Sequence, residues 1–145
     1  MKRRRGFTLV ELAVVVVIIG VLAAFAVPRF IASVERSKAA EAFNYLSTVQ
    51  AAQERYHARQ GEYASLITDL DIKFTTPKYF TAGVIAAGST TSLEDSWTQS
   101  LTRLGAAAGY GAYTVTFTEE GYDTVNSTIS AIPTINPMAT GGGGS

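Results

Sequence analysis

The stretch from Lys2 to Phe30, KRRRGFTLVELAVVVVIIGVLAAFAVPRF, decides how this chain folds. Four basic residues and a glycine precede an apolar run from Phe7 to Val27, in which only Thr8 and Glu11 are clearly polar. At about 1.5 Å per residue, a helix of these 21 residues spans roughly 30 Å, the thickness of the hydrocarbon layer of a bilayer. The many β-branched side chains would also suit a buried strand, but strands rarely exceed about ten residues. The run therefore predicts a membrane-spanning helix.

Charge is distributed unevenly along the 145 residues. Lysine and arginine total 12, as do aspartate and glutamate, but four of the cations lie at Lys2–Arg5. From Phe7 onward eight basic side chains face twelve acidic ones, a net charge of −4, which argues against nucleic-acid binding. The basic cluster before the apolar run predicts a cytoplasmic N-terminus. The chain has no cysteine, which excludes disulfides and thiolate metal sites.

Glu11 is a carboxylate inside a segment of membrane length. Charges in such segments are costly and usually functional, unless they are paired or lie near the membrane edge. Glu11 is only five residues from Gly6, so one interpretation places it at the level of the lipid headgroups. The other interpretation gives it a charged partner.

Three interpretations of the whole N-terminal segment compete. It could be a cleaved secretory signal peptide, because Ala24–Ala26 (AFA) fits an A-x-A cleavage site, although Glu11 interrupts the entry to its apolar core. It could be an uncleaved single-pass anchor. Third, the residues RRRGFTLVEL at Arg3–Leu12 resemble the cleavage and methylation motif of type IV prepilins and type II secretion pseudopilins. The basic leader, the glycine, the TLVEL sequence and the apolar run together favour this third interpretation.

The resemblance implies a role for each residue of the junction. Residues 1–6 would be a leader that a prepilin peptidase removes after Gly6, and the same enzyme would methylate the new N-terminus at Phe7. Glu11 lies four residues later, on the same helix face, and would pair with the Phe7 ammonium of a neighbouring subunit to set the axial register. The segment between Gly20 and Pro28 would unwind when subunits pack into a filament; a simple kink is the alternative.

The resemblance also implies a function and partners. The chain would be a non-enzymatic structural subunit of a type IV pilus, without a cofactor, that polymerises with copies of itself. Its other partners would be the prepilin peptidase, an inner-membrane platform protein and an assembly ATPase. It would lie in the inner membrane before it enters a surface or periplasmic filament. Two alternatives stay open: a major pseudopilin of a type II secretion system, and an exported or anchored binding protein that uses its N-terminus only as an export signal.

Residues 29–60 continue the helix with an amphipathic pattern. Together with residues 7–28 they predict a helix of 54 residues, roughly 80 Å long, that ends at Gly61. A helix of this length is too long to be covered by its own small domain, so lipid or other copies must bury its first half. The predicted buried stripe consists of Ala39, Ala42, Leu46, Val49, Gln53 and Tyr56. The charged side chains assigned to the other faces are Glu35, Arg36, Lys38, Glu41, Glu54, Arg55 and Arg59.

Residues 61–137 predict a small α/β head, so that the whole chain has an α+β fold, the type IV pilin fold: a long N-terminal helix against a small antiparallel sheet. We expect a turn at 65–70, a second helix in Thr90–Leu104 with a capping box from Ser92 and a stripe of Leu93, Trp97, Leu101 and Leu104, and three strands. The strands are expected at 79–86, around 113–118, where Tyr113, Val115 and Phe117 alternate with threonines, and at 122–132 after a hairpin turn at Glu119–Gly121. Residues 138–145 are expected to be a flexible tail, whose GGGGS end resembles a linker or an engineered appendage.

The head offers little catalytic or metal-binding chemistry. His57 is the only histidine, so neither a zinc site nor a Ser-His-Asp triad is predicted, and we expect it on the helix surface. Glu119, Glu120 and Asp123 cluster at the expected hairpin turn and form a weak calcium candidate, because calcium prefers six or more oxygen ligands and no ligand loop is present. A solvated turn is the simpler interpretation. No catalytic residue and no other metal ligand are predicted.

Overall fold

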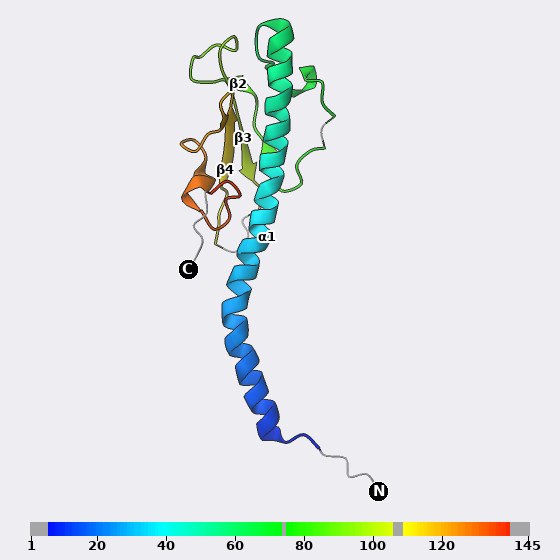
Figure 1. The fold of residues 1–145 in the computed structure, drawn as a ribbon, viewed down its shortest axis with the longest axis vertical. Helices are drawn as coiled ribbons and strands as arrows, with labels where there is room; N and C mark the ends of the chain where they lie inside the picture. Colours follow the sequence, from blue (N-terminus) through cyan, green and yellow to red (C-terminus); the bar gives the residue numbers. More distant parts are fainter. Residues whose placement is uncertain (1–5, 74, 106–108, 140–145) are drawn as a thin grey trace.

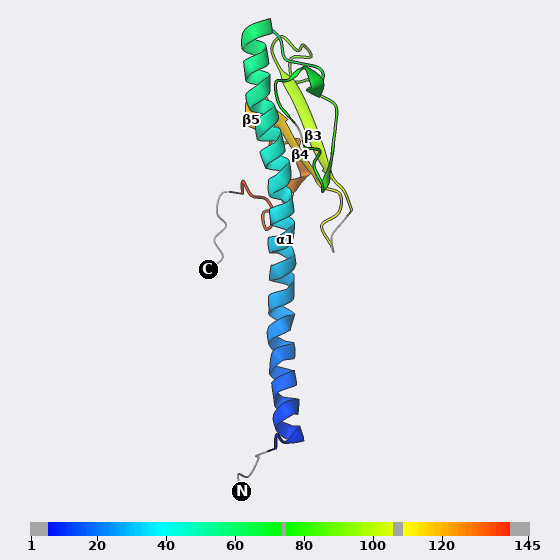
Figure 2. The same ribbon diagram turned by 90° about the vertical axis from the view of Figure 1, so that its right-hand side faces the viewer.

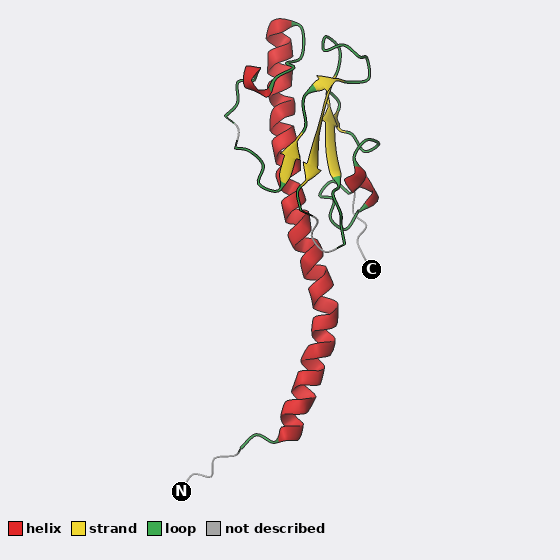
Figure 3. Cartoon of the chain, turned by 180° about the vertical axis from the view of Figure 1, so that it is seen from behind, coloured by secondary structure: helices red, strands yellow, loops and turns green. Residues whose placement is uncertain are grey.

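One long helix carries a small head on its upper half in a computed structural model of the chain (Figures 1 and 3). The structure describes residues 6–73, 75–105 and 109–139. The elements in chain order are α1 (Leu9–Gln60), η1 (Ile67–Asp69), β1 (Phe80–Ala82), β2 (Ala86–Ala87), β3 (Trp97–Arg103), β4 (Thr114–Thr118), β5 (Gly121–Tyr122) and η2 (Thr128–Ala131). The predicted α+β fold, a long N-terminal helix beside a small antiparallel sheet, is confirmed.

Helix α1 runs without interruption for 52 residues. It ends where the sequence predicts, because Gly61 adopts a left-handed conformation with φ of 81° that residues with a side chain rarely take. The Gly61 N–H donates to the His57 carbonyl oxygen at 2.8 Å and so closes the last turn. The sheet packs only against the upper half of the helix, as Figure 2 shows from the side.

The predicted stripe on α1 forms the helical side of the core. Its first five members, Ala39 through Gln53, are fully buried, and Tyr56 is half-buried at the upper end. The prediction was wrong for Glu35, which we expected on an exposed face. Glu35 is 1% exposed and extends the stripe downward by one turn, because Arg103 of the sheet reaches it there.

Strand β3 corrects the predicted second helix. Residues 97–103 form the strand at the centre of the sheet, which has the order β1-β3-β4-β5 with β2 also paired to β3. Its buried side chains alternate with period two: Trp97, Gln99, Leu101 and Arg103. Two of these four are polar, so the apolar residues alone suggested a helical spacing. Leu104, the last member of that predicted stripe, is exposed.

The turn before β3 is also not a helix start. The Ser92 hydroxyl accepts a hydrogen bond from the Glu94 N–H at 3.2 Å, two residues on, instead of capping a helix with Asp95. Such a short local bond is typical of a turn formed by serine. The segment therefore brings the chain round into β3.

Strand β4 and its hairpin confirm the predicted alternation and turn. Tyr113, Val115 and Phe117 are buried against α1. Residues 119–120 form the turn, and β5 pairs with β4 through Phe117↔Tyr122 and Thr118↔Gly121.

The returning strand is shorter than the predicted 122–132, because β5 ends at Tyr122. Beyond it, side-chain hydroxyls replace the backbone acceptors of a regular ladder. The Thr116 N–H donates to Ser127 Oγ at 2.8 Å, and the Thr114 N–H donates to Thr128 Oγ1 at 2.7 Å. The edge of β4 is thus satisfied without a strand, and the chain turns into η2.

The strand predicted at 79–86 is split in two. Strands β1 and β2 pair with opposite ends of β3, and Gly83 lies between them. The Gly83 N–H donates to the Ser100 carbonyl oxygen at 2.8 Å, and a Cβ on Gly83 would lie 2.9 Å from that oxygen. Only glycine allows this close approach at the break.

Gln53 joins the helix to the first loop of the head. Its amide accepts from the Ala64 N–H at 2.8 Å and donates to the Ala64 carbonyl oxygen at 2.9 Å, and both residues are buried. We expect Gln53→Met to lower the free energy of unfolding by about 2–4 kcal/mol, because two buried backbone groups lose their partners. Denaturant unfolding of the full chain in detergent measures this. Gln60→Met, at the exposed end of the same helix, is the control, and an equal effect in the two variants would contradict the assignment.

Candidate functional site

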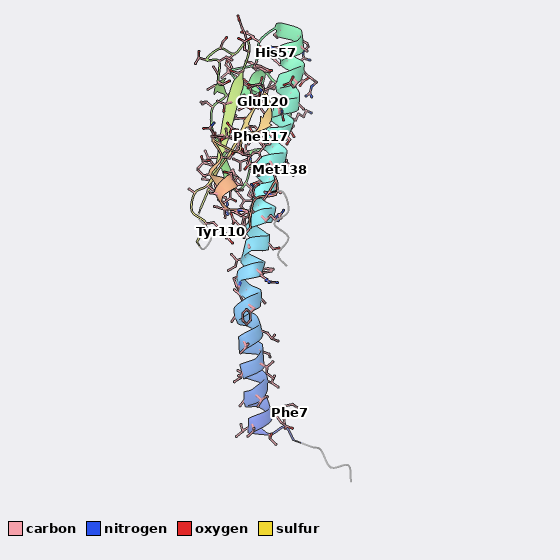
Figure 4. All side chains as sticks on the ribbon, turned by 60° about the vertical axis from the view of Figure 1, so that its left-hand side comes forward. Phe7, His57, Tyr110, Phe117, Glu120 and Met138 are labelled. Carbon is pink, nitrogen blue, oxygen red and sulfur yellow. The ribbon has the colours of Figure 1, made fainter. Side chains whose placement is uncertain are left out.

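The junction predicted for processing lies outside the helix. Gly6, Phe7 and Thr8 precede α1 and are all exposed, with Phe7 72% exposed. Figure 4 shows Phe7 at the lower end of the molecule, far from the head. Among the described residues, no heavy atom beyond the chain neighbours lies within 4 Å of where a Gly6 side chain would begin. Exposed, non-helical peptide bonds are those that proteases reach, so the Gly6–Phe7 bond is accessible.

Thr8 and Glu11 form a capping box that fixes the start of the helix. The Thr8 N–H and hydroxyl both donate to Glu11 Oε2, at 2.8 and 2.9 Å, and the Glu11 N–H donates to Thr8 Oγ1 at 3.2 Å. These bonds satisfy N–H groups that have no partner inside the helix, so α1 begins at Leu9 and not at Phe7. These bonds also hold the Glu11 carboxylate against Thr8, the residue that follows Phe7 in the chain. The role of Thr8 was not predicted, although the T-x-x-E pattern could have revealed it.

The lower half of α1 presents an almost wholly apolar surface. Its large side chains are exposed from Leu9 to Phe30, and none of the residues in its most apolar 18-residue window is buried. This helix is long and apolar enough to cross a membrane. The described residues of the head do not cover this segment.

Gly20 and Pro28 both lie inside the continuous helix. The axis of α1 curves gently along its lower half (Figures 1 and 3). Proline lacks an N–H, so one backbone hydrogen bond is missing at Pro28. The unwinding between these residues concerns packed subunits and stays a prediction.

Two of the three carboxylates of the calcium candidate, Glu119 and Asp123, accept hydrogen bonds from different parts of the chain, and Glu120 is exposed. Glu119 Oε2 accepts from the Trp97 N–H at 3.2 Å and so supports the start of β3. Asp123 accepts from the N–H groups of Val125 and Asn126, and from the Asn126 side chain at 2.6 Å. Among the residues that the structure describes, no three His, Asp or Glu side chains come together as a metal-binding group.

His57 lies half-buried near the top of α1, where its ring stacks on Tyr63 with centroids 4.3 Å apart. Its Nε2 lies 2.9 Å from the Glu94 carbonyl oxygen. These contacts tie the turn before β3 to the helix, which is a structural role.

A buried polar cluster, which the sequence did not predict, joins α1 to the sheet. Arg103 donates through Nε to Glu35 Oε1 at 2.6 Å and through Nη2 to Oε2 at 3.1 Å, and the Tyr113 hydroxyl donates to Oε1 at 2.8 Å. Burial raises the pKa of Glu35, but the hydrogen bonds from Arg103 and Tyr113 outweigh it, so the pKa lies below its ordinary value. Burial and the Glu35 carboxylate raise the pKa of Tyr113, which keeps its hydroxyl protonated as a donor.

Comparisons with known proteins agree with the geometry of the junction. The family model for the prokaryotic N-terminal methylation motif matches residues 1–27. A fimbrial protein of Pseudomonas aeruginosa is 31% identical over 115 residues, which cover 75% of this chain and 73% of that protein. The chain belongs to the type IV pilin family. The match to the Pseudomonas protein extends this pilin's relationship well beyond the N-terminal motif into the head.

Two further relatives show the breadth of the family. The type IV major pilin protein PilA of Myxococcus xanthus is 43% identical over 68 residues, 47% of this pilin. That match spans only 31% of the Myxococcus protein. Core protein G of the type II secretion system of Pectobacterium carotovorum is 35% identical over 75 residues, 52% of this pilin and 48% of that protein. No solved structure matches the chain significantly.

Proposed function

We propose that this pilin is a structural, non-enzymatic subunit of a type IV pilus filament. The observation that carries the proposal is the exposed apolar half of α1, from Leu9 to Phe30, which the head does not cover. Such a surface is stable only in lipid or against other apolar helices. The same segment therefore serves as a membrane anchor before assembly and as the contact between subunits afterwards.

Processing would convert the anchored precursor into the assembling form. A prepilin peptidase would cut the accessible bond after Gly6 and methylate Phe7, which removes the basic leader and creates an ammonium group. That ammonium would pair with the Glu11 carboxylate, and the hydrogen bond from the Thr8 N–H to Glu11, one residue from Phe7 in the chain, supports this. Between staggered copies the same two groups would set the axial register.

The proposed route begins in the inner membrane with the N-terminus in the cytoplasm. A platform protein and an assembly ATPase would move processed subunits from the membrane into a filament at the cell surface. Gly20 and Pro28 would allow α1 to unwind locally as the helices pack. The leader charge, the apolar span and the family relationship support this order of events.

We expect filaments sheared from cells to contain a mature chain that begins with N-methyl-Phe7. Mass spectrometry of the N-terminal peptide, with electron microscopy of the same material, tests this. Gly6→Val is the control. A Cβ at this position would meet no heavy atom of the described residues within 4 Å beyond its chain neighbours, whereas the added side chain would obstruct the peptidase, leaving a full-length precursor and no filaments. A mature chain starting at Val27, or an intact Met1 in sheared filaments, would refute the proposed processing.

A second candidate function is that of a major pseudopilin, and the match to core protein G of a type II secretion system favours it. The two functions share the processing and the helical contact, so the mature N-terminus does not separate them. Deletion of the gene separates the two functions. Loss of surface filaments with normal protein export supports the pilus, whereas loss of export without loss of filaments supports the pseudopilus.

A further inference from the structure

The charges of the head are separated along the direction of α1. We call the part of the head beside helix residues 29–41 its lower end. Lys78 lies at this level because its N–H donates to Glu41, and Arg103 because it pairs with Glu35. This end carries two carboxylates, Glu35 and Glu41, and five cations: Arg29, Arg36, Lys38, Lys78 and Arg103.

The opposite end of the head is acidic. We call the part beside helix residues 54–60 its upper end, where the Glu94 carbonyl contacts His57 and Asp71 pairs with Arg55. This end carries two guanidinium groups, Arg55 and Arg59, and six carboxylates: Glu54, Glu62, Asp69, Asp71, Glu94 and Asp95.

The ion pairs within the chain leave this separation in place. Asp71 forms ion pairs with the two arginines of the upper end, and Glu35 forms ion pairs with Arg103 and Lys38. In the described part of the chain, no ion pair involves the exposed cations Arg36 and Lys78, nor the exposed carboxylates Glu54, Glu62, Asp69, Glu94 and Asp95. Each end thus keeps a surplus of one sign.

The lower end is a built arrangement. The Tyr79 ring lies 5.2 Å from Lys38 Nζ, 5.3 Å from Lys78 Nζ and 5.6 Å from the Arg103 guanidinium. The backbone N–H groups of Lys78 and Tyr79 donate to the Glu41 carboxylate at 2.8 and 3.0 Å, which fixes this loop on the helix. Three cations are therefore held around one aromatic ring. Arg103 is buried and Lys38 also pairs with Glu35, so the exposed Lys78 is the one of the three that is available to a carboxylate of another copy.

We propose that the basic lower end of one head binds the acidic upper end of another copy of this chain. This inference rests on the proposed function and adds the surface by which heads meet. Copies in a filament of parallel helices all point the same way, so the lower end of one head faces the upper end of a head below it. Complementary charges there select this head-to-tail contact and disfavour two like ends. Single exposed pairs are weak, but every subunit repeats the contact on both sides.

The bilayer is the other anionic surface near the lower end, because Arg29 lies at the upper end of the apolar segment. The two partners make different demands. A membrane would need only the cations, whereas a second copy also needs the carboxylates of the upper end. Exchanging the charges of the two ends distinguishes them.

The test compares filament yield for three variants of the full-length chain. Arg36→Glu with Lys78→Glu reverses two cations that form no ion pair, and Glu62→Lys with Glu94→Lys reverses two such carboxylates. We expect each double variant to lower the mass of sheared filaments at least fivefold, with unchanged amounts of processed protein in the membrane. The variant with all four substitutions has the parent's net charge and exchanges the signs of these four residues between the two ends, so the four positions are again of opposite sign across the contact. We expect it to recover at least half of the parent's yield.

Lys73→Glu is the matched control for Lys78→Glu, because it makes the same change on an exposed side chain between the two ends. We expect it to lie within twofold of the parent. Normal yield in both double variants would overturn the inference while filaments of the parent chain still support the proposed function. Loss of yield only in the cation variant, without recovery in the fourfold variant, would assign the lower end to the membrane and also overturn it. A parent chain that forms no filaments would instead refute the proposed function.

Discussion

Replacing Arg103 by methionine is expected to lower the free energy of unfolding of the head by about 3–5 kcal/mol, the range for breaking a buried ion pair. Methionine occupies similar volume but leaves the Glu35 carboxylate, which is 1% exposed, without the two hydrogen bonds from the Arg103 guanidinium. Denaturant unfolding of the full chain in detergent measures the change. The fluorescence of Trp97 reports this unfolding, because Trp97 is the only tryptophan and is fully buried on β3, the strand that also carries Arg103.

Arg55→Met is the matched control for this prediction. Arg55 also binds a carboxylate, Asp71, at 2.8 Å, but the two side chains are 48% and 40% exposed. Water solvates both charges when the pair is broken, so we expect a loss below about 1 kcal/mol. The double variant Glu35→Met with Arg103→Met should lose less than Arg103→Met alone, because no buried charge is left unpaired. Equal losses in Arg103→Met and Arg55→Met would show that the buried pair has no special weight.

The same cluster predicts a pH dependence with a definite sign. The pKa of Glu35 is lower in the folded chain than in the unfolded chain, so the cluster stabilises the fold above the unfolded value of about 4.3. That stability is lost as the pH falls below this value and through the folded pKa. Glu35→Gln removes the titrating group. We therefore expect the stability difference between parent and Glu35→Gln to shrink between pH 7 and pH 3; a constant difference would contradict this.

Features that depend on local sequence could be predicted, whereas those that depend on distant partners could not. The stripe on α1, the stop at Gly61 and the alternation around Val115 each follow from a short periodic pattern or a single residue type. Strand β3 could not be predicted in this way, because its buried Gln99 and Arg103 form hydrogen bonds with residues that are distant in the sequence. Arg103 is polar in the sequence and belongs to the core only because Glu35, 68 residues earlier, faces it.

The functional features differ in the same way in whether the sequence could predict them. Gly6, Phe7 and Glu11 belong to one continuous motif, so their roles could be proposed from the sequence alone. The charge separation between the two ends of the head could not, because it arises when loops from three parts of the chain meet the same helix. Composition records only that acidic and basic residues are equal in number.

Glu11→Gln is expected to leave cleavage after Gly6 intact and to lower the filament yield at least tenfold. Glutamine retains the capping box, because its amide oxygen accepts from the Thr8 N–H as the carboxylate does. Only the charge is lost, and with it the counter-ion for the Phe7 ammonium in an apolar environment. An unpaired buried charge costs about 3–5 kcal/mol, which exceeds the roughly 1.4 kcal/mol that corresponds to a tenfold change. Filament mass per processed subunit, from sheared and membrane fractions, is the measurement.

Thr8→Ala separates the two roles that the structure gives to Glu11. This variant loses the hydroxyl that accepts from the Glu11 N–H, at a cost of about 1 kcal/mol to the helix start, but keeps the charge. If Glu11 acts by pairing with Phe7, Thr8→Ala assembles within about threefold of the parent while Glu11→Gln fails. If Glu11 acts as a helix cap, the order is reversed, because glutamine preserves the cap and alanine does not. The pairing hypothesis thus requires assembly to follow the charge at position 11 and to be nearly independent of the hydroxyl at position 8.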